Sequence, residues 1–118
     1  MASDKDYCDY ATCVALKELG YNYPLELITD YFGVLDVPFH DKKIHLYDAQ
    51  KWLREEKNIE ANASFDKMEN GWIAFIQRLD YPDMCGTDVF STIYNTYESA
   101  LLVSIKEAIE ILKKENND

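Results

Sequence analysis

The spacing of the apolar residues changes at Asn58, and this change constrains the fold more than any other feature of the chain. Residues 48–57 carry their large apolar side chains at the i, i+3, i+4 spacing of a helix. Residues 59–66 instead alternate apolar and polar side chains, as a strand with one buried face does. Residues 71–79 are apolar up to Gln77 and are typical of a central strand. The pattern therefore predicts a helix that leads directly into an antiparallel pair of strands.

The predicted helix has a narrow apolar side and a charged side. Asp48 is expected to be its N-cap, because a carboxylate accepts hydrogen bonds from first-turn amides, and Asn58 is expected to end it. The stripe that faces the core contains Ala49, Trp52, Leu53 and Glu56, whereas Lys51, Arg54, Glu55 and Lys57 face water. We therefore expect Trp52 to be a core residue.

The remaining elements complete the predicted architecture. We expect a helix over residues 7–19 that ends at Gly20, strands near 27–32 and 43–47 that either form a hairpin or flank an irregular loop, a strand over 89–94, and a final helix capped by Asn95. This order predicts an α+β fold in which a small antiparallel sheet of three to five strands packs against about three helices. The 118 residues suit one domain, with 1–6 and 115–118 frayed.

The chain is strongly acidic, with 12 basic and 22 acidic residues and a net charge of −10. Only residues 41–58 are not net negative, since five basic and four acidic residues give +1 there. Phosphate repels an acidic protein, so direct nucleic-acid binding is not expected. No apolar run reaches the ~20 residues that span a bilayer, so no membrane partner is expected either.

Three cysteines, Cys8, Cys13 and Cys85, make an odd number in a chain that begins without a signal-peptide pattern. This favours a reducing, cytoplasmic location. Cys8 and Cys13 are five residues apart, so on one helix they would face different directions. They are therefore interpreted as small apolar core residues.

Three segments resemble a family of small uncharacterised proteins encoded by phages and prophages of gut anaerobic bacteria. They are Ala-Leu-Lys-Glu-Leu-Gly-Tyr at 15–21, the stretch from Tyr47 to Ile59 with its Trp-Leu-Arg-Glu core, and Thr-Tyr-Glu-Ser-Ala-Leu at 96–101. The resemblance covers most of the chain but leaves out residues 22–46. It departs at Tyr47, where relatives often carry a Ser/Thr-Pro-like helix start. It implies a phage or prophage accessory protein without an established activity.

No catalytic, cofactor-binding or metal-binding residue is predicted, although two groups deserve a test. His40, Asp41 and His45 are of the residue types that ligate a metal, but their spacing is equally that of exposed loop residues. Cys85, in a loop with Pro82 and Gly86, is a possible nucleophile, but no motif supplies its base. A cryptic enzyme using His40, His45 or Cys85 is thus the least favoured hypothesis.

The favoured hypothesis is a non-enzymatic protein that binds a protein partner or itself. Nine tyrosines in an acidic chain suggest aromatic anchors for a basic partner. The candidate partner-binding residues are Lys51, Arg54, Lys57, Tyr7, Tyr10 and Tyr81. The alternative is an inhibitor of host defence that mimics nucleic acid, which would require Asp4, Asp6, Asp9, Glu18, Asp30 and Asp36 to form one patch.

Overall fold

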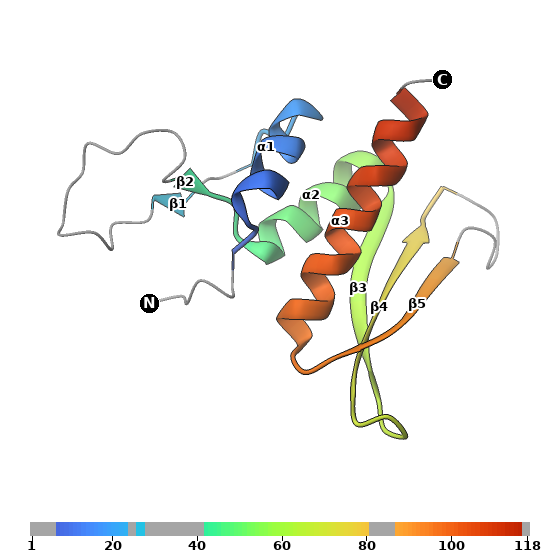
Figure 1. Ribbon diagram of the computed structural model, residues 1–118. Helices are drawn as coiled ribbons and strands as arrows, with labels where there is room; N and C mark the ends of the chain where they lie inside the picture. The colour runs from blue at the N-terminus through green and yellow to red at the C-terminus, as the bar shows by residue number, and fades with distance from the viewer. Residues whose placement is uncertain (1–6, 24–25, 28–41, 81–86, 117–118) are drawn as a thin grey trace, which may run out of the picture.

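A computed structural model of the chain describes residues 7–23, 26–27, 42–80 and 87–116 (Figure 1). In chain order, these residues form α1 (Tyr10–Glu18), β1 (Glu26–Leu27), β2 (Lys42–Lys43), α2 (Leu46–Lys57), β3 (Ile59–Asp66), β4 (Gly71–Arg78), β5 (Thr87–Tyr94) and α3 (Tyr97–Asn116). The protein has an α+β fold, as its sequence predicts.

The change of spacing at Asn58 is the junction between α2 and β3. Asn58 adopts a left-handed conformation, with φ of 58°, and ends the helix there as predicted. β3, β4 and β5 form one antiparallel sheet in that order. Ile59 pairs with Arg78 and Asp66 with Gly71, so the predicted hairpin forms over its full length.

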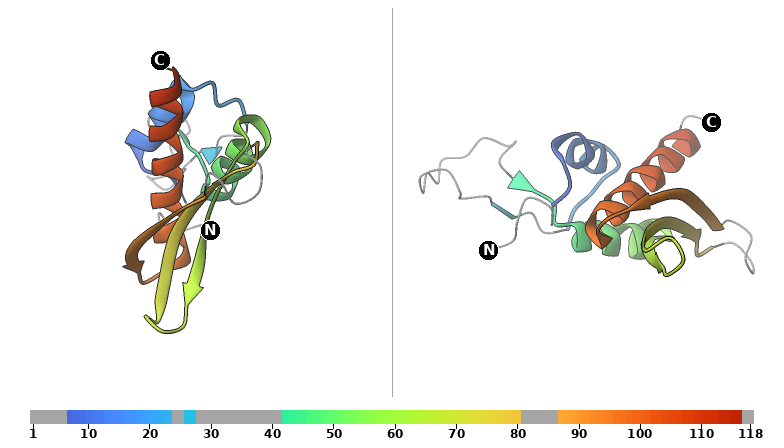
Figure 2. Two further views of the ribbon diagram at one scale, coloured as in Figure 1. Left: turned by 90° about the vertical axis from the view of Figure 1, so that its right-hand side faces the viewer. Right: turned by 60° about the horizontal axis from the view of Figure 1, so that its bottom comes forward.

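The helices cover one face and one edge of this sheet. α3 packs across β3 and β4, whereas α2 lies beside β3, at the edge of the sheet (Figures 1 and 2). The Gln50 side chain donates a 2.8 Å hydrogen bond from α2 to the main-chain oxygen of Ala61. The face towards α3 is called the inner face, and in the described part of the chain no helix covers the outer face (Figure 2).

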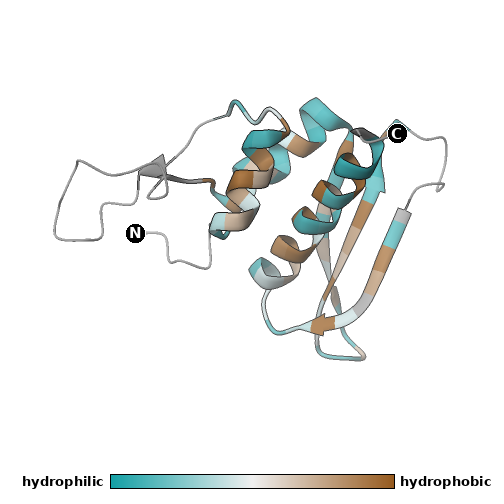
Figure 3. Cartoon of the chain, turned by 45° about the horizontal axis from the view of Figure 1, so that its top comes forward, coloured by the Kyte–Doolittle hydropathy of each residue, from teal (hydrophilic) through white to brown (hydrophobic). Residues whose placement is uncertain are grey.

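The hydrophobic core lies between the inner face, α2 and α3. Apolar and polar residues alternate around both helices (Figure 3). Trp52 is 2% exposed, which confirms its predicted place in the core. One side of the final helix is buried as well, and the fully buried side chains include Leu16, Ile44, Leu53, Ile59, Ile76, Leu101 and Ile105.

The prediction that Asp48 caps α2 is wrong. The helix begins at Leu46, and Nδ1 of His45 accepts a 3.2 Å hydrogen bond from the Tyr47 amide. Leu46 is 1% exposed. Burying that side chain favours a helix that starts three residues earlier, so Asp48 occupies the first turn, where its negative charge interacts favourably with the helix dipole.

Thr96, not Asn95, caps the final helix. The Thr96 hydroxyl oxygen accepts a 3.1 Å hydrogen bond from the Ser99 amide, the bond that an N-cap residue makes. The helix extends to Asn116 and so includes residues 115 and 116, which were expected to fray. Glu115 forms a 2.7 Å ion pair with Arg78 of β4, and this contact holds the last turn against the sheet.

The first helix is shorter at its start than predicted, because Tyr7 and Cys8 are extended. Tyr7 bridges His45 in antiparallel fashion, and the Cys8 amide donates a 2.8 Å bond to the Ile44 oxygen. Since Cys8 precedes the helix, the expectation that Cys8 and Cys13 face apart is also wrong. The Cys13 thiol donates to the Cys8 oxygen at 3.6 Å, and both thiols are buried.

The other end of α1 follows the prediction. Gly20 has φ of +103°. The amides of Gly20 and Tyr21 donate 3.0 Å bonds to the oxygens of Lys17 and Leu16, which is the Schellman ending. This ending turns the chain so that the Tyr21 ring meets Trp52, with 5.6 Å between ring centroids.

The predicted first hairpin is only partly described. β1 and β2 are antiparallel, with Glu26 opposite Lys43 and Leu27 opposite Lys42. The expected strand near 27–32 lies outside the described residues beyond Leu27. The expected strand near 43–47 is wrong at its end, because residues 46 and 47 belong to α2.

The Asp9 carboxylate is expected to make stability depend on pH below about 4. Its partial burial opposes ionisation, but bonds from Lys106 and from the Thr12 amide outweigh this and lower the pKa of Asp9 to about 2. The ionised form is therefore favoured in the folded state, and its contribution is lost as pH falls from 3.8 towards 2. The contribution is about 0.5–1 kcal/mol, because both side chains are nearly half exposed.

Asp9→Asn should isolate this charge effect, because asparagine is an equally good helix cap. Urea denaturation at a series of pH values should give a smaller loss of stability between pH about 4 and 2 for the variant than for the native chain. Lys106→Met should also reduce the loss of stability between pH about 4 and 2, but by less than Asp9→Asn does. Identical pH profiles for the native chain and Asp9→Asn would refute the assigned role of the carboxylate.

Candidate functional site

Six side chains form a continuous series of ring contacts across the protein, which we call the aromatic ladder: Tyr7, His45, Tyr47, Tyr97, Trp72 and Phe65. The centroid distances along this series are 5.4, 5.1, 6.5, 5.2 and 5.3 Å. The His45–Tyr47 and Tyr47–Tyr97 pairs are stacked and the other three pairs are edge-to-face, and both geometries are favourable for aromatic rings. The ladder joins the first described residues to the turn of the β3–β4 hairpin.

Secondary structure brings these rings together from distant positions in the sequence. The turn at residues 67–70 sets the register that places Phe65 opposite Trp72 on the inner face. The hairpin continues past the first turn of α3, where Tyr97 lies (Figure 1). Tyr97 therefore meets Trp72 on one side and Tyr47, in the first turn of α2, on the other.

The ladder is anchored but not buried. The Tyr97 hydroxyl donates a 2.7 Å hydrogen bond to Oδ1 of Asn62, which also accepts the Ala63 amide at 2.8 Å. Tyr47 is 47% exposed and Phe65 is 46% exposed, and the four other rings are partly exposed. The ladder thus presents an ordered aromatic surface to solvent.

The predicted partner-binding residues do not form one surface. Tyr7 belongs to the ladder, whereas Tyr10 is 56% exposed at the start of α1 and is not one of its rings. Tyr81 lies outside the described residues. Lys57 is at the far end of α2, roughly 18 Å along the helix from His45.

The three basic residues of α2 differ in their contacts. Arg54 pairs with Glu60 at 3.5 Å, and the Lys57 ammonium lies 5.5 Å from the centre of the Trp52 ring. Lys51 is exposed. Two of the three therefore have contacts within the fold, where Lys57 covers a core side chain and Arg54 links α2 to β3.

The acidic patch required for nucleic-acid mimicry is not assembled by the residues that can be placed. Asp9 caps α1 and pairs with Lys106 at 2.7 Å, so its charge is compensated. Glu18 is exposed at the other end of the same helix. Asp4, Asp6, Asp30 and Asp36 lie outside the described residues.

The residues considered for catalysis or metal binding are not brought together in the described ranges. Within them, no group of three or more His, Cys, Asp or Glu side chains is arranged to hold a metal ion. His45 uses Nδ1 to cap α2. The Cys8 thiol is not set up as a nucleophile, because a side-chain hydrogen bond with Cys13 and burial both raise the pKa of Cys8. His40, Asp41 and Cys85 are outside the described residues.

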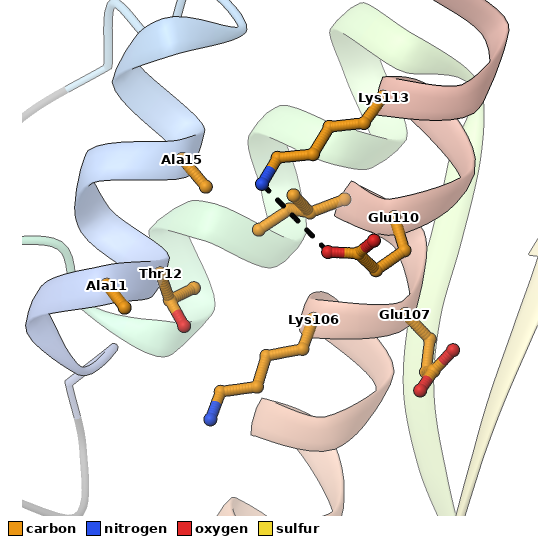
Figure 4. A pocket seen from close by; sticks show the side chains of 8 residues that line it. Ala11, Thr12, Ala15, Lys106, Glu107, Glu110 and Lys113 are labelled. Atoms are coloured by element: carbon orange, nitrogen blue, oxygen red, sulfur yellow. Dashed lines mark ion pairs between the residues drawn. The ribbon is translucent and has the colours of Figure 1, made fainter.

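A groove of about 270 Å³ lies between α1 and α3 (Figure 4). It is lined by Ala11, Thr12, Ala15, Lys106, Glu107, Ile109, Glu110 and Lys113. Lys106 pairs with Asp9, and Lys113 lies 3.9 Å from Glu110. The groove is smaller than most ligand pockets and carries both signs of charge, so it is a weaker candidate site than the ladder.

Only Tyr7 of the ladder was among the predicted partner-binding residues, and His45, Tyr47, Phe65, Trp72 and Tyr97 were not. The sequence does contain a signal for Phe65 and Trp72. A turn at 67–70 between two strands makes Phe65 and Trp72 a cross-strand aromatic pair. Their contact with α2 and α3 depends on tertiary packing, which the sequence pattern does not specify.

None of the helices in the described ranges is both long and apolar enough to cross a membrane. No protein-family model, no curated protein and no solved structure matches the chain significantly.

Proposed function

We propose that this protein is a non-enzymatic binding module that holds a segment of a basic partner protein on its aromatic ladder. The observation that carries the proposal is the half-exposed state of Tyr47 and Phe65 within a series of six ordered rings. Aromatic rings are enriched in protein interfaces, because they bury a large area and lose little conformational entropy. Covering such a surface with a partner removes a large apolar area from water and therefore favours binding.

Charge favours a basic partner. The net charge of −10 attracts positively charged proteins over distances of about a Debye length and repels nucleic acid. Arginine and lysine side chains also bind directly over tyrosine and tryptophan rings. A partner segment rich in arginine suits both features.

Binding is better supported than catalysis by the residues that can be placed. His45 is held as a helix cap, and the Cys8 and Cys13 thiols are buried. We also propose a cytoplasmic location in a phage or prophage setting. The two neighbouring thiols, which no disulfide joins, support a reducing compartment, and the sequence resemblance supports the setting.

The test is a comparison of two surface variants. Tagged native chain, the double variant Tyr47→Ser/Phe65→Ser and the control Leu79→Ser are used to capture proteins from the organism that encodes the chain. Leu79 is 45% exposed and follows the opposite end of β4, so it matches Phe65 in exposure but lies off the ladder. Captured proteins are identified by mass spectrometry, and the partner is then purified for titration.

We expect a basic partner that binds the native chain and Leu79→Ser equally and binds the double variant at least about tenfold more weakly. Binding should weaken as NaCl rises from about 50 to 500 mM, since salt screens the attraction. A partner that binds all three chains equally would refute the role of the ladder. Failure of the native chain to retain any partner would count against the binding function itself.

A further inference from the structure

The start of α1 brings two cysteine thiols together. Cys8 lies immediately before the cap residue Asp9, and Cys13 is the fourth residue of the helix. Side chains at these two positions commonly pack against each other in the contact called the hydrophobic staple. The Cys13 thiol donates a 3.6 Å hydrogen bond to the Cys8 main-chain oxygen, and a side-chain hydrogen bond also links the two cysteines. We call this pair the thiol staple.

A staple needs only two apolar side chains, but two cysteines can also form a covalent bond. A disulfide requires two sulfur atoms that face one another at short range, and the hydrogen bond between the side chains of the thiol staple provides that arrangement. A separation of five residues would keep the two thiols apart within a regular helix. The position of Cys8 before the helix is therefore what creates the pair.

Access to the thiol staple depends on residues 7 and 8. Cys8 is 1% exposed and Cys13 is 4% exposed, so an oxidant in solution cannot reach either sulfur in the closed state. A short antiparallel bridge holds the segment, in which Tyr7 pairs with His45 and the Cys8 amide donates a 2.8 Å bond to the Ile44 oxygen. Breaking so short a pairing requires much less free energy than global unfolding, so the segment can open locally.

We propose that the thiol staple is a redox-sensitive site, which closes into a Cys8–Cys13 disulfide when the compartment contains glutathione disulfide or a similar small disulfide. The bond would fix residues 7 and 8 to α1 independently of their pairing with residues 44 and 45. In a reducing compartment the pair remains a dithiol, which agrees with the location proposed above. This proposal does not depend on the function of the aromatic ladder.

The exchange proceeds in two steps and needs no other reactant. In the closed state, the hydrogen bond with Cys13 and burial raise the pKa of the Cys8 thiol, so its sulfur reacts only after residues 7 and 8 open. The Cys8 thiolate then attacks one sulfur of glutathione disulfide and releases a glutathione thiolate, which takes up the proton that Cys8 lost. Cys13 loses its proton, attacks the Cys8 sulfur and releases the second glutathione in the same way. Two protein thiols are thus oxidised, and one glutathione disulfide is reduced to two thiols.

The test uses the full chain with Cys85→Ala, which leaves the thiol staple as the source of any intramolecular disulfide. The folded protein and the same protein in denaturing urea are equilibrated with glutathione buffers of increasing oxidation, quenched with acid, alkylated and digested with trypsin. Lys5 and Lys17 are the nearest tryptic sites on each side, so both cysteines fall in the single peptide 6–17. Mass spectrometry distinguishes the disulfide, which lacks two hydrogen atoms, from a glutathione adduct. The matched control, Cys85→Ala/Cys13→Ala, cannot close the bond.

Hydrogen exchange gives a second readout, because the Cys8 amide is bonded to Ile44 only while residues 7 and 8 are closed. The disulfide should slow the exchange of this amide by about tenfold, since the segment then stays attached to α1. The same glutathione treatment should not slow the exchange in the control variant.

We expect the folded chain to form the disulfide in a buffer at least about tenfold more reducing than the chain in urea requires, because the fold holds the two sulfurs together. Equal glutathione ratios for the folded and the unfolded chain would overturn the proposal, since the fold would then not favour the bond. A folded chain that accumulates the glutathione adduct in place of the disulfide would overturn it as well. So would an oxidised chain whose Cys8 amide exchanges as fast as that of the reduced chain.

Discussion

Replacing Trp52 by alanine is expected to lower the free energy of unfolding by about 3–5 kcal/mol. Trp52 is 2% exposed, and its ring contacts Tyr21 on one side, while the Lys57 ammonium lies over it. The substitution leaves a cavity in the core beside Tyr21, which the surrounding residues fill only in part. A domain of this size is stable by about 5–15 kcal/mol, so the variant should be marginally folded at 37 °C.

Urea denaturation followed by circular dichroism measures this loss directly. Tyr10→Ala serves as the control, because it also removes an aromatic side chain but at a 56% exposed position, and it should change stability by less than about 0.5 kcal/mol. Equal stability of the two variants would mean that Trp52 does not support the core.

Gly71→Ala is expected to destabilise the protein by about 1–3 kcal/mol because β4 and β5 approach too closely for a β-carbon. A β-carbon at Gly71 would collide with Cγ2 of Ile93 and lie 3.0 Å from the Tyr94 main-chain oxygen. Isoleucine is branched at Cβ, so its methyl group has few alternative rotamers. The first residue of β4 therefore has to be glycine for the β5 pairing to keep its register.

A double-variant cycle with Ile93→Ala distinguishes this contact from a general effect of alanine. Removing the Ile93 methyl group should relieve part of the cost of Gly71→Ala, so the two changes should be less than additive. Gly20→Ala is the matched control, since no atom lies within 4 Å of its β-carbon position and its cost comes from φ of +103°. Its effect should add to that of Ile93→Ala. Full additivity at Gly71 would contradict the steric explanation.

The sheet was predictable because its signals are local. Alternation from Ile59 to Asp66 and the turn that follows define a strand and its pairing, and the structure has the same limits. The starts of the helices were less predictable. Asp48 is a better cap than His45 by local preference, but the burial of Leu46 determines where α2 begins. The cap of the final helix was also hard to predict, because Asn95 and Thr96 are both good cap residues and lie one position apart. The structure uses Thr96.

The candidate site was much less predictable than the fold. Composition indicated aromatic anchors, and Tyr7 does lie in the ladder. The other ladder tyrosines, Tyr47 and Tyr97, are 50 residues apart in the sequence and meet only because the first turns of α2 and α3 are neighbours. The pattern of residues along the chain does not predict a contact between two helices. The basic residues of α2 were chosen as candidates because of their charge, which the sequence shows directly.

The two short pairings near the N-terminus have a consequence for how this chain can be altered. Glu26 and Leu27 pair with Lys43 and Lys42, and Tyr7 and Cys8 are bonded to His45 and Ile44. The two residues that border the interval 28–41, Leu27 and Lys42, are therefore partners in one antiparallel pairing. Loop-closure entropy rises by only about 0.6 kcal/mol for each doubling of length. Because the bordering residues are already paired, a modest change in the number of residues between them should alter the entropy of closing this connection by less than about 1 kcal/mol.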